Sequence, residues 1–158
     1  MKIKNNIKYK KGFTLIEILV VIGIIAVLAG VVLVAINPSR QFKLARDSQR
    51  VSNVNAILNT ISQNIAEHKG LFMCGQNVMV IPVQVAVIRS GNAQNTFDIA
   101  SCVIPSYISS LPFDPSAQGA HFTDNTDYDT QYSVVADNNG RVSVSAVGEI
   151  TPVISVTR

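Results

Sequence analysis

An uninterrupted apolar run near the N-terminus constrains the fold of this chain more than any other feature of its sequence. From Ile18 to Ile36, 19 consecutive residues carry neither a charge nor a strongly hydrogen-bonding side chain. An α-helix of that length is about 28 Å long, close to the roughly 30 Å hydrocarbon core of a lipid bilayer. We therefore expect one membrane-spanning helix over residues 13–37.

Charge is distributed unevenly along the 158 residues. The sequence has 13 Lys and Arg against 10 Asp and Glu. Five of the basic residues precede the apolar run: Lys2, Lys4, Lys8, Lys10 and Lys11. By the positive-inside rule this end stays in the cytoplasm and the residues after Pro38 lie outside it. Because the rest of the chain has more acidic than basic residues, the charge pattern does not favour a nucleic-acid-binding protein.

Glu17 stands at the head of the apolar run, where a carboxylate inside a bilayer costs roughly 2.5–3.5 kcal/mol on insertion scales. Intramembrane acids are usually paired, so we expect Glu17 to have a partner; an interfacial glutamate that reaches water is the alternative.

Two cleavage points stay open. A secretory signal peptide is cut after its apolar core, here between Ala29 and Gly30, whereas the Gly12-Phe13 junction precedes the core.

The residues around that junction, Lys11-Gly12-Phe13-Thr14-Leu15-Ile16-Glu17, resemble the class III signal of type IV prepilins and type II secretion pseudopilins. The resemblance implies that residues 1–12 are a leader, that a prepilin peptidase cleaves between Gly12 and Phe13, and that Phe13 is then N-methylated. It also implies that Glu17 pairs with the Phe13 ammonium of a neighbouring subunit and sets the filament register. The motif covers residues 1–36, and beyond them only the layout is similar.

The resemblance implies a structural subunit of a type IV pilus-like filament, a homopolymer held together by its N-terminal helix. Its partners would be the prepilin peptidase and an inner-membrane assembly platform with its ATPase. The chain would lie in the cytoplasmic membrane before assembly and in an extracellular or periplasmic filament afterwards, with DNA only as uptake cargo. The alternatives are a major pseudopilin of a type II secretion system and a secreted or membrane-anchored binding domain. The sequence holds no catalytic constellation, so we expect neither an enzyme nor a cofactor.

A second helix is predicted within residues 38–70, after a break at Asn37-Pro38. Apolar residues recur there at spacings of three and four, which indicates one buried face: Val54, Ile57, Leu58, Ile61 and Ile65. Gly70 is the expected C-cap. Four basic residues near the start of the helix form a predicted solvated collar beside lipid headgroups, with acids of a neighbouring subunit as alternative partners: Arg40, Lys43, Arg46 and Arg50.

Residues 71–158 are predicted to form a small antiparallel β-rich head that completes its core on this helix, an α+β pilin fold. Val- and Ile-rich residues 77–89 predict an edge strand or two short strands around Pro82. Residues 97–103 predict another strand, and polar residues 118–130 predict a loop. Alternating residues 131–136 and 141–147 flank Asn139-Gly140, the strongest hairpin signal in the chain.

Cys74 and Cys102 both follow the apolar run and should lie outside the cytoplasm, where disulfides persist. We expect them to form a disulfide, with two buried thiols as the alternative. Asp124, Asp127 and Asp129 crowd one segment and could hold Ca²⁺, an ion that major pseudopilins bind in this part of the chain. Their spacing does not match an EF-hand, so a solvated acidic loop without metal is favoured.

Overall fold

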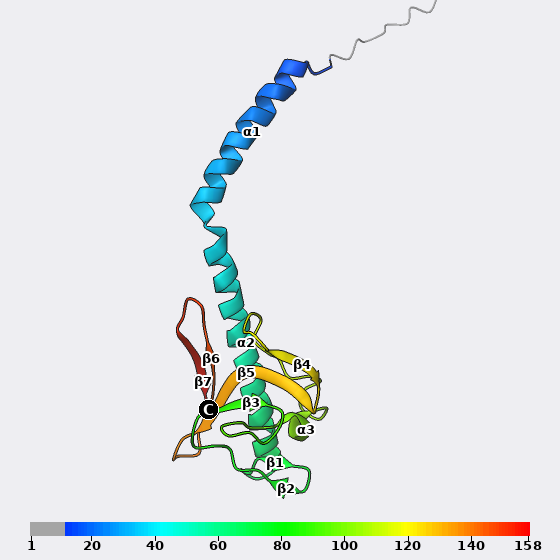
Figure 1. Cartoon of the computed structure of the whole chain (residues 1–158), viewed down its shortest axis with the longest axis vertical. Coiled ribbons are helices and arrows are strands. Elements are labelled where there is room, and N and C mark those ends of the chain that lie inside the picture. The colour runs from blue at the N-terminus through cyan, green and yellow to red at the C-terminus, as the bar shows by residue number, and fades with distance from the viewer. Residues whose placement is uncertain (1–11) are drawn as a thin grey trace, which may run out of the picture. The chain divides into compact units, whose positions relative to one another are not determined.

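The computed structural model describes residues 12–158 and divides into two compact units, one ending at Gln41 and one running from Phe42 to Arg158. The first is built on helix α1, Leu15–Ile36. The second contains most of helix α2, Pro38–Glu67, together with all the strands (Figure 1). The leader predicted for residues 1–12 lies outside the described residues, apart from Gly12.

Helix α1 follows the predicted apolar run, and none of its 22 residues is buried. Among the described residues it is the one helix long and apolar enough to cross a membrane. It ends at Asn37, whose φ of 48° is left-handed. Asn tolerates that conformation because its side chain bonds locally; here it accepts from Ser39 Oγ at 3.0 Å and Arg40 N at 3.3 Å. The predicted break is confirmed, and Pro38 opens α2, where a missing N–H costs little.

Helix α2 buries the predicted apolar stripe. Four of its five residues are fully buried and the fifth is partly buried against the same core: Val54, Ile57, Leu58, Ile61 and Ile65. The helix ends at Glu67, after which Lys69 turns left-handed with φ 58° and Gly70 N donates to Ile65 O at 2.9 Å. The predicted cap at Gly70 is therefore shared with Lys69.

The head is an antiparallel sheet with α2 behind it (Figure 1). Its five strands are β3 Ala86–Arg89, β4 His121–Asp124, β5 Asp127–Ala136, β6 Val142–Val147 and β7 Val153–Thr157. Their order is β3-β5-β6-β7, with β4 pairing the start of β5. A separate ladder joins β1, Met73–Cys74, to β2, Asn77–Val78, and α3 is a single turn at Ala100–Val103.

The core lies between α2 and the sheet. Its largest fully buried side chains include Tyr128, Tyr132 and Ile88 from the sheet beside Ile57 and Leu58 from α2. The sheet is small, and burying its inner face against a helix supplies what a few strands alone cannot. The predicted α+β class, with a long apolar helix followed by a helix packed on an antiparallel sheet, is confirmed.

The predicted hairpin forms between β5 and β6, where Ala136 pairs with Val142. Gly140 takes the positive φ of 80° that the turn requires. The carboxylate of Asp137 accepts from Asn139 N and Arg141 N, both at 2.8 Å, and so closes the turn. Hydrogen bonds within the turn therefore determine the conformation of the loop at residues 137–140.

The strand predicted over residues 97–103 is wrong, since Ala100–Val103 form α3. The buried hydroxyl of Tyr128 accepts from Ile99 N at 2.9 Å and Ala100 N at 3.3 Å, which satisfies two donors at the start of this turn. Residues 77–89 form two short strands, β2 and β3, as one of the two predictions for Pro82 allowed.

The loop predicted over residues 118–130 is also wrong, because it contains β4 and the start of β5. Asp124 Oδ1 accepts from Thr126 N at 2.7 Å and Asp127 N at 3.1 Å, so a polar side chain closes a tight hairpin. Tyr128 and Tyr132 are four residues apart, so both lie on the inner face of β5 and enter the core, while Gln131 between them has a left-handed φ of 59°. Polar composition concealed a strand whose buried residues do not alternate regularly.

Candidate functional site

The N-terminus of α1 is closed by a capping box between Thr14 and Glu17. Thr14 is the N-cap, with extended backbone, and its Oγ1 accepts from Glu17 N at 3.3 Å. In return the Glu17 carboxylate accepts from Thr14 N at 2.7 Å and Thr14 Oγ1 at 2.8 Å. Within a single chain, the one charge of α1 thus satisfies donors that the first helical turn leaves unpaired.

Sequence reasoning singled out Glu17 and missed Thr14. The signal was present, because Thr-x-x-Glu before an apolar run is the capping-box spacing. The capping box assigns Glu17 a local structural role in addition to the intersubunit role that the resemblance implies. Both bonds from Thr14 go to Oε2 of Glu17, so a partner outside the chain can bind the other carboxylate oxygen without displacing them.

Gly12 and Phe13 precede the helix in open surroundings. A Cβ atom placed on Gly12 would meet nothing within 4 Å, and Phe13 is 85% exposed. The structure therefore presents the backbone between these two residues without cover from the described part of the chain. The lysines before them lie outside the described residues.

The rest of α1 presents apolar side chains on every face, and its residues are exposed throughout. An exposed apolar surface of this extent is unfavourable in water and marks a segment that contacts lipid or other apolar helices. The helix satisfies its own backbone hydrogen bonds, as a segment in lipid must.

A comparison with known protein families matches residues 7–33, which include the Gly12-Phe13 junction, Thr14 and Glu17. The chain carries a prokaryotic N-terminal methylation motif. This motif, a class III signal peptide, is typical of type IV pilins and pseudopilins. Proteins of this kind are typically structural rather than enzymatic. No curated protein and no solved structure matches the chain.

The methylation motif ends well before the head. On α2, the solvated basic collar predicted from the sequence is wrong for two of its four residues. Arg50 is buried, not solvated, and its guanidinium is clamped by acids of its own chain. It donates to Asp114 through Nε at 2.7 Å and Nη2 at 2.9 Å, and to Asp47 through Nη1 at 2.8 Å. Arg46 makes a bidentate pair with Glu149 at 2.5 and 2.6 Å. Only Arg40 and Lys43 keep the exposed positions predicted for all four.

Asp47 fixes the loop between β6 and β7 to α2. Its carboxylate accepts from three successive backbone N–H groups, those of Glu149, Ile150 and Thr151, at 2.8–3.0 Å. Gly148 allows this approach, because a Cβ there would lie 2.1 Å from Thr151 O and 3.1 Å from the carboxylate. One acid of α2 thus determines where the loop lies, over a sequence separation of about a hundred residues.

The electrostatics of this cluster favour the charged forms of its members. Burial would raise the pKa of Asp47, but the three loop N–H groups and Arg50 hold that pKa well below its usual value. Burial also opposes ionisation of Asp114, whose pKa is lowered by Arg50 and two backbone donors. Arg46 lowers the pKa of Glu149 to about 2, with help from Ser116 and Arg50. The cluster is therefore a set of permanent charges at neutral pH.

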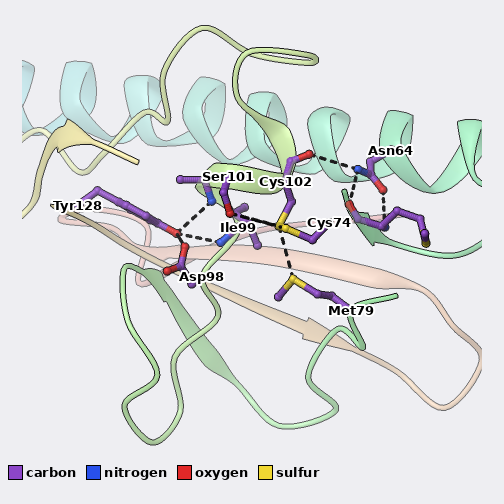
Figure 2. The surroundings of a disulfide bond; sticks show 10 residues. Asn64, Cys74, Met79, Asp98, Ile99, Ser101, Cys102 and Tyr128 are labelled. Atoms are coloured by element: carbon purple, nitrogen blue, oxygen red, sulfur yellow. Dashed lines mark hydrogen bonds between the residues drawn. A yellow bond between two sulfur atoms is a disulfide. The ribbon is translucent and has the colours of Figure 1, made fainter. Parts of the chain in front are cut away.

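Cys74 of β1 and Cys102 of α3 form a disulfide in the structure, with Cα atoms 4.3 Å apart (Figure 2). Figure 2 shows Met79 Sδ beside Cys102 Sγ, 3.4 Å away, and Asn64 on α2 bonded to the backbone around β1. Asn64 accepts from Met73 N at 2.8 Å and donates to Met73 O at 2.9 Å. That Cys74 and Cys102 are bonded to each other in the cell stays a prediction.

The three acids of the predicted calcium loop have separate partners. Asp124 closes its own turn, Asp127 Oδ1 lies 3.1 Å from His121 Nε2, and Asp129 accepts from Gln131 N at 3.0 Å. Across residues 12–158, no group of three His, Cys, Asp or Glu side chains is placed to hold a metal ion. The segment is a β-hairpin with local hydrogen bonds.

Proposed function

We propose that this protein is a structural subunit of a type IV pilus-like filament and not an enzyme. The observation that carries the proposal is the methylation motif, followed at once by an apolar helix with no buried residue and one charge, Glu17. Such a helix needs apolar surroundings, which a bilayer supplies before assembly and neighbouring copies supply afterwards.

Processing belongs to the same proposal. A prepilin peptidase cuts between Gly12 and Phe13, and the new amino group of Phe13 becomes N-methylated. The exposed backbone around Gly12 and the absence of a Cβ there support access by a protease. The lysine-rich end sets the orientation, with the N-terminus in the cytoplasm and the head outside, and α1 keeps the chain in the cytoplasmic membrane until assembly.

Assembly then joins the Glu17 carboxylate of one subunit to the Phe13 ammonium of its neighbour. Two opposite charges in an apolar helix bundle stabilise each other, whereas a wrongly staggered neighbour leaves both buried without a partner. Glu17 is near Phe13 in sequence and already accepts from Thr14, the residue after it. A carboxylate this close to the start of its own helix can also bind the ammonium group at the start of an adjacent helix.

The mature N-terminus tests the proposal. Mass spectrometry on protein from intact cells should find a methylated Phe13 as the first residue. A chain that begins at Gly30 would show that the apolar helix is removed as an ordinary signal peptide, and the filament proposal would fail. An intact Met1 in cells with an active prepilin peptidase would indicate an anchored ectodomain instead.

Electron microscopy separates the pilus from the pseudopilus of a type II secretion system. Cells that lack this chain should lose surface filaments, and filaments labelled by antibodies to the head should return when the chain is restored. A secretion defect in the same deletion strain, with surface filaments unchanged, would assign the chain to a pseudopilus.

A further inference from the structure

We infer that Arg40, Phe42 and Lys43, at the start of α2, form a contact site for anionic phospholipid headgroups while the chain is still in the membrane. We call these three residues the headgroup contact. The inference rests on the part of the proposed function in which α1 spans the bilayer, and it goes beyond it by naming a lipid partner. It is drawn from the basic side chains near the end of α1 that form no salt bridge within the described residues.

Arg40 and Lys43 lie close to the apolar helix along the chain. Arg40 and Lys43 follow Ile36, the last residue of α1, by four and seven positions. With 1.5 Å per helical residue and at most about 3.6 Å per residue across the break at Asn37, both lie within about 15 Å of that end along the chain. The headgroup layers together add about 10–15 Å to the hydrocarbon core, so long basic side chains can reach one of them.

The other basic residues of this stretch are already paired with acids of the same chain. Arg46 and Arg50 are bound by Glu149, Asp114 and Asp47 of the same chain. Arg40 and Lys43 are exposed and form no salt bridge within the described residues. Asp47 is the only acidic residue between Glu17 and Glu67, and its carboxylate is already bonded. These two cations therefore lack an internal counter-charge.

An exposed aromatic residue lies between the two cations in the sequence. Phe42 is 64% exposed and packs in no part of the core. An apolar ring flanked by cations suits an interface with an acyl boundary below and phosphate groups around it. Because lipid surrounds a spanning helix on all sides, the three side chains need not share one helix face. Charge complementarity selects anionic over zwitterionic headgroups.

The test uses the full chain in lipid nanodiscs with the substitution Phe42→Trp, which places the only tryptophan in the chain at the headgroup contact. All nanodiscs contain phosphatidylcholine and phosphatidylglycerol at the same ratio. Bromine, a quencher of tryptophan fluorescence, is placed at shallow acyl positions of either the anionic or the zwitterionic lipid, at equal mole fraction. The comparison therefore measures which lipid lies next to residue 42.

We expect brominated phosphatidylglycerol to quench several-fold more than brominated phosphatidylcholine. Each basic residue near a bilayer contributes about fivefold to the preference for anionic lipid. The difference should disappear with Arg40→Gln and Lys43→Gln together, and in about 1 M salt, where screening is strong. It should persist in the matched control with Lys69→Gln and Arg89→Gln, which removes the same charge elsewhere.

Equal quenching by the two lipids would overturn the inference while leaving α1 in the bilayer. A preference that survives removal of Arg40 and Lys43 would also overturn it, because the cations would not be its cause. Quenching by neither lipid would show that residue 42 does not reach the bilayer and would likewise overturn the inference, without bearing on whether α1 spans it.

Discussion

Arg50 on α2 and Asp114, 64 residues later, form a bidentate ion pair, with Nε 2.7 Å from Oδ2 and Nη2 2.9 Å from Oδ1. Both side chains are 4% exposed. Two parallel bonds in fork geometry fix the direction of the guanidinium as well as its place. The pair therefore holds the segment before β4 against α2, and with Asp47 and Glu149 it joins that segment to the β6–β7 loop.

The first prediction concerns this pair. Arg50→Met should lower the free energy of unfolding by about 3–5 kcal/mol, because removing one partner leaves buried carboxylates without their cation. Urea unfolding of the detergent-solubilised chain, followed by near-ultraviolet circular dichroism of the buried tyrosines, measures it. Arg46→Met is the matched control, since its pair with Glu149 is more exposed, at 34% and 24%, and such pairs contribute under about 1 kcal/mol. Equal losses in the two variants would contradict the assigned role of Arg50.

Gly148 gives a second prediction. Gly148→Ala should destabilise the head by about 1–3 kcal/mol, since the new methyl group would collide with Thr151 O and force the loop away from Asp47. The same urea experiment measures the loss. Gly140→Ala is a useful comparison, because nothing lies within 4 Å of a Cβ there and only its positive φ of 80° opposes the change. A Gly148 variant with unchanged stability would show that the Asp47 contacts are not fixed in solution.

The third prediction is loss of stability in acid. The pKa of Glu149 falls from 4.5 to about 2 on folding, and those of Asp47 and Asp114 also fall. Groups with a lowered folded pKa bind fewer protons when folded, so their stabilisation is present above pH 4.5 and lost as the pH falls toward 2. The urea midpoint should be level from pH 7 to 5 and then decline. Glu149→Gln should make the decline shallower, and an identical profile would contradict the assignment.

The disulfide gives a fourth prediction. Replacing Cys74 and Cys102 by Ser should lower the free energy of unfolding by roughly 3–4 kcal/mol, because a link across 28 residues restricts the unfolded chain. Reduction of the unmodified protein with dithiothreitol should give the same loss. Ser101→Ala is the control, as its hydroxyl only approaches Cys74 Sγ at 3.6 Å and should contribute little. Insensitivity to dithiothreitol would indicate that the two cysteines are not bonded in the isolated protein.

Local patterns in the sequence predicted much of this fold. The apolar run, the stripe from Val54 to Ile65 and the hairpin at Asn139-Gly140 each depend on neighbours within a few positions, and each was found. The failures involve partners distant in sequence. No local pattern near residues 97–103 indicates that a tyrosine hydroxyl from β5 accepts hydrogen bonds from their backbone. The polar sequence of β4 likewise does not indicate that it pairs with β5.

The candidate site divides in the same way. Gly12, Phe13 and Glu17 stood out from the sequence because the methylation motif is contiguous. The charge cluster did not, since Asp47 and Arg50 of α2 meet Asp114 and Glu149 over separations of 64 to 102 residues. Four basic residues on one helix looked alike in the sequence, and only the tertiary structure divides them into two that are bound and two that are free to meet a partner.

The last prediction separates the two roles of Glu17. Glu17→Gln keeps the capping-box spacing but removes the charge, whereas Thr14→Ala keeps the charge and removes the N-cap side chain. If Glu17 sets the register by pairing with a neighbouring ammonium, Glu17→Gln should abolish or greatly reduce filaments. Thr14→Ala should cost about 1 kcal/mol of helix stability and leave filaments near the wild-type number. Electron microscopy of cells with matched protein levels provides the count, and filaments unchanged by Glu17→Gln would leave Glu17 with its capping role alone.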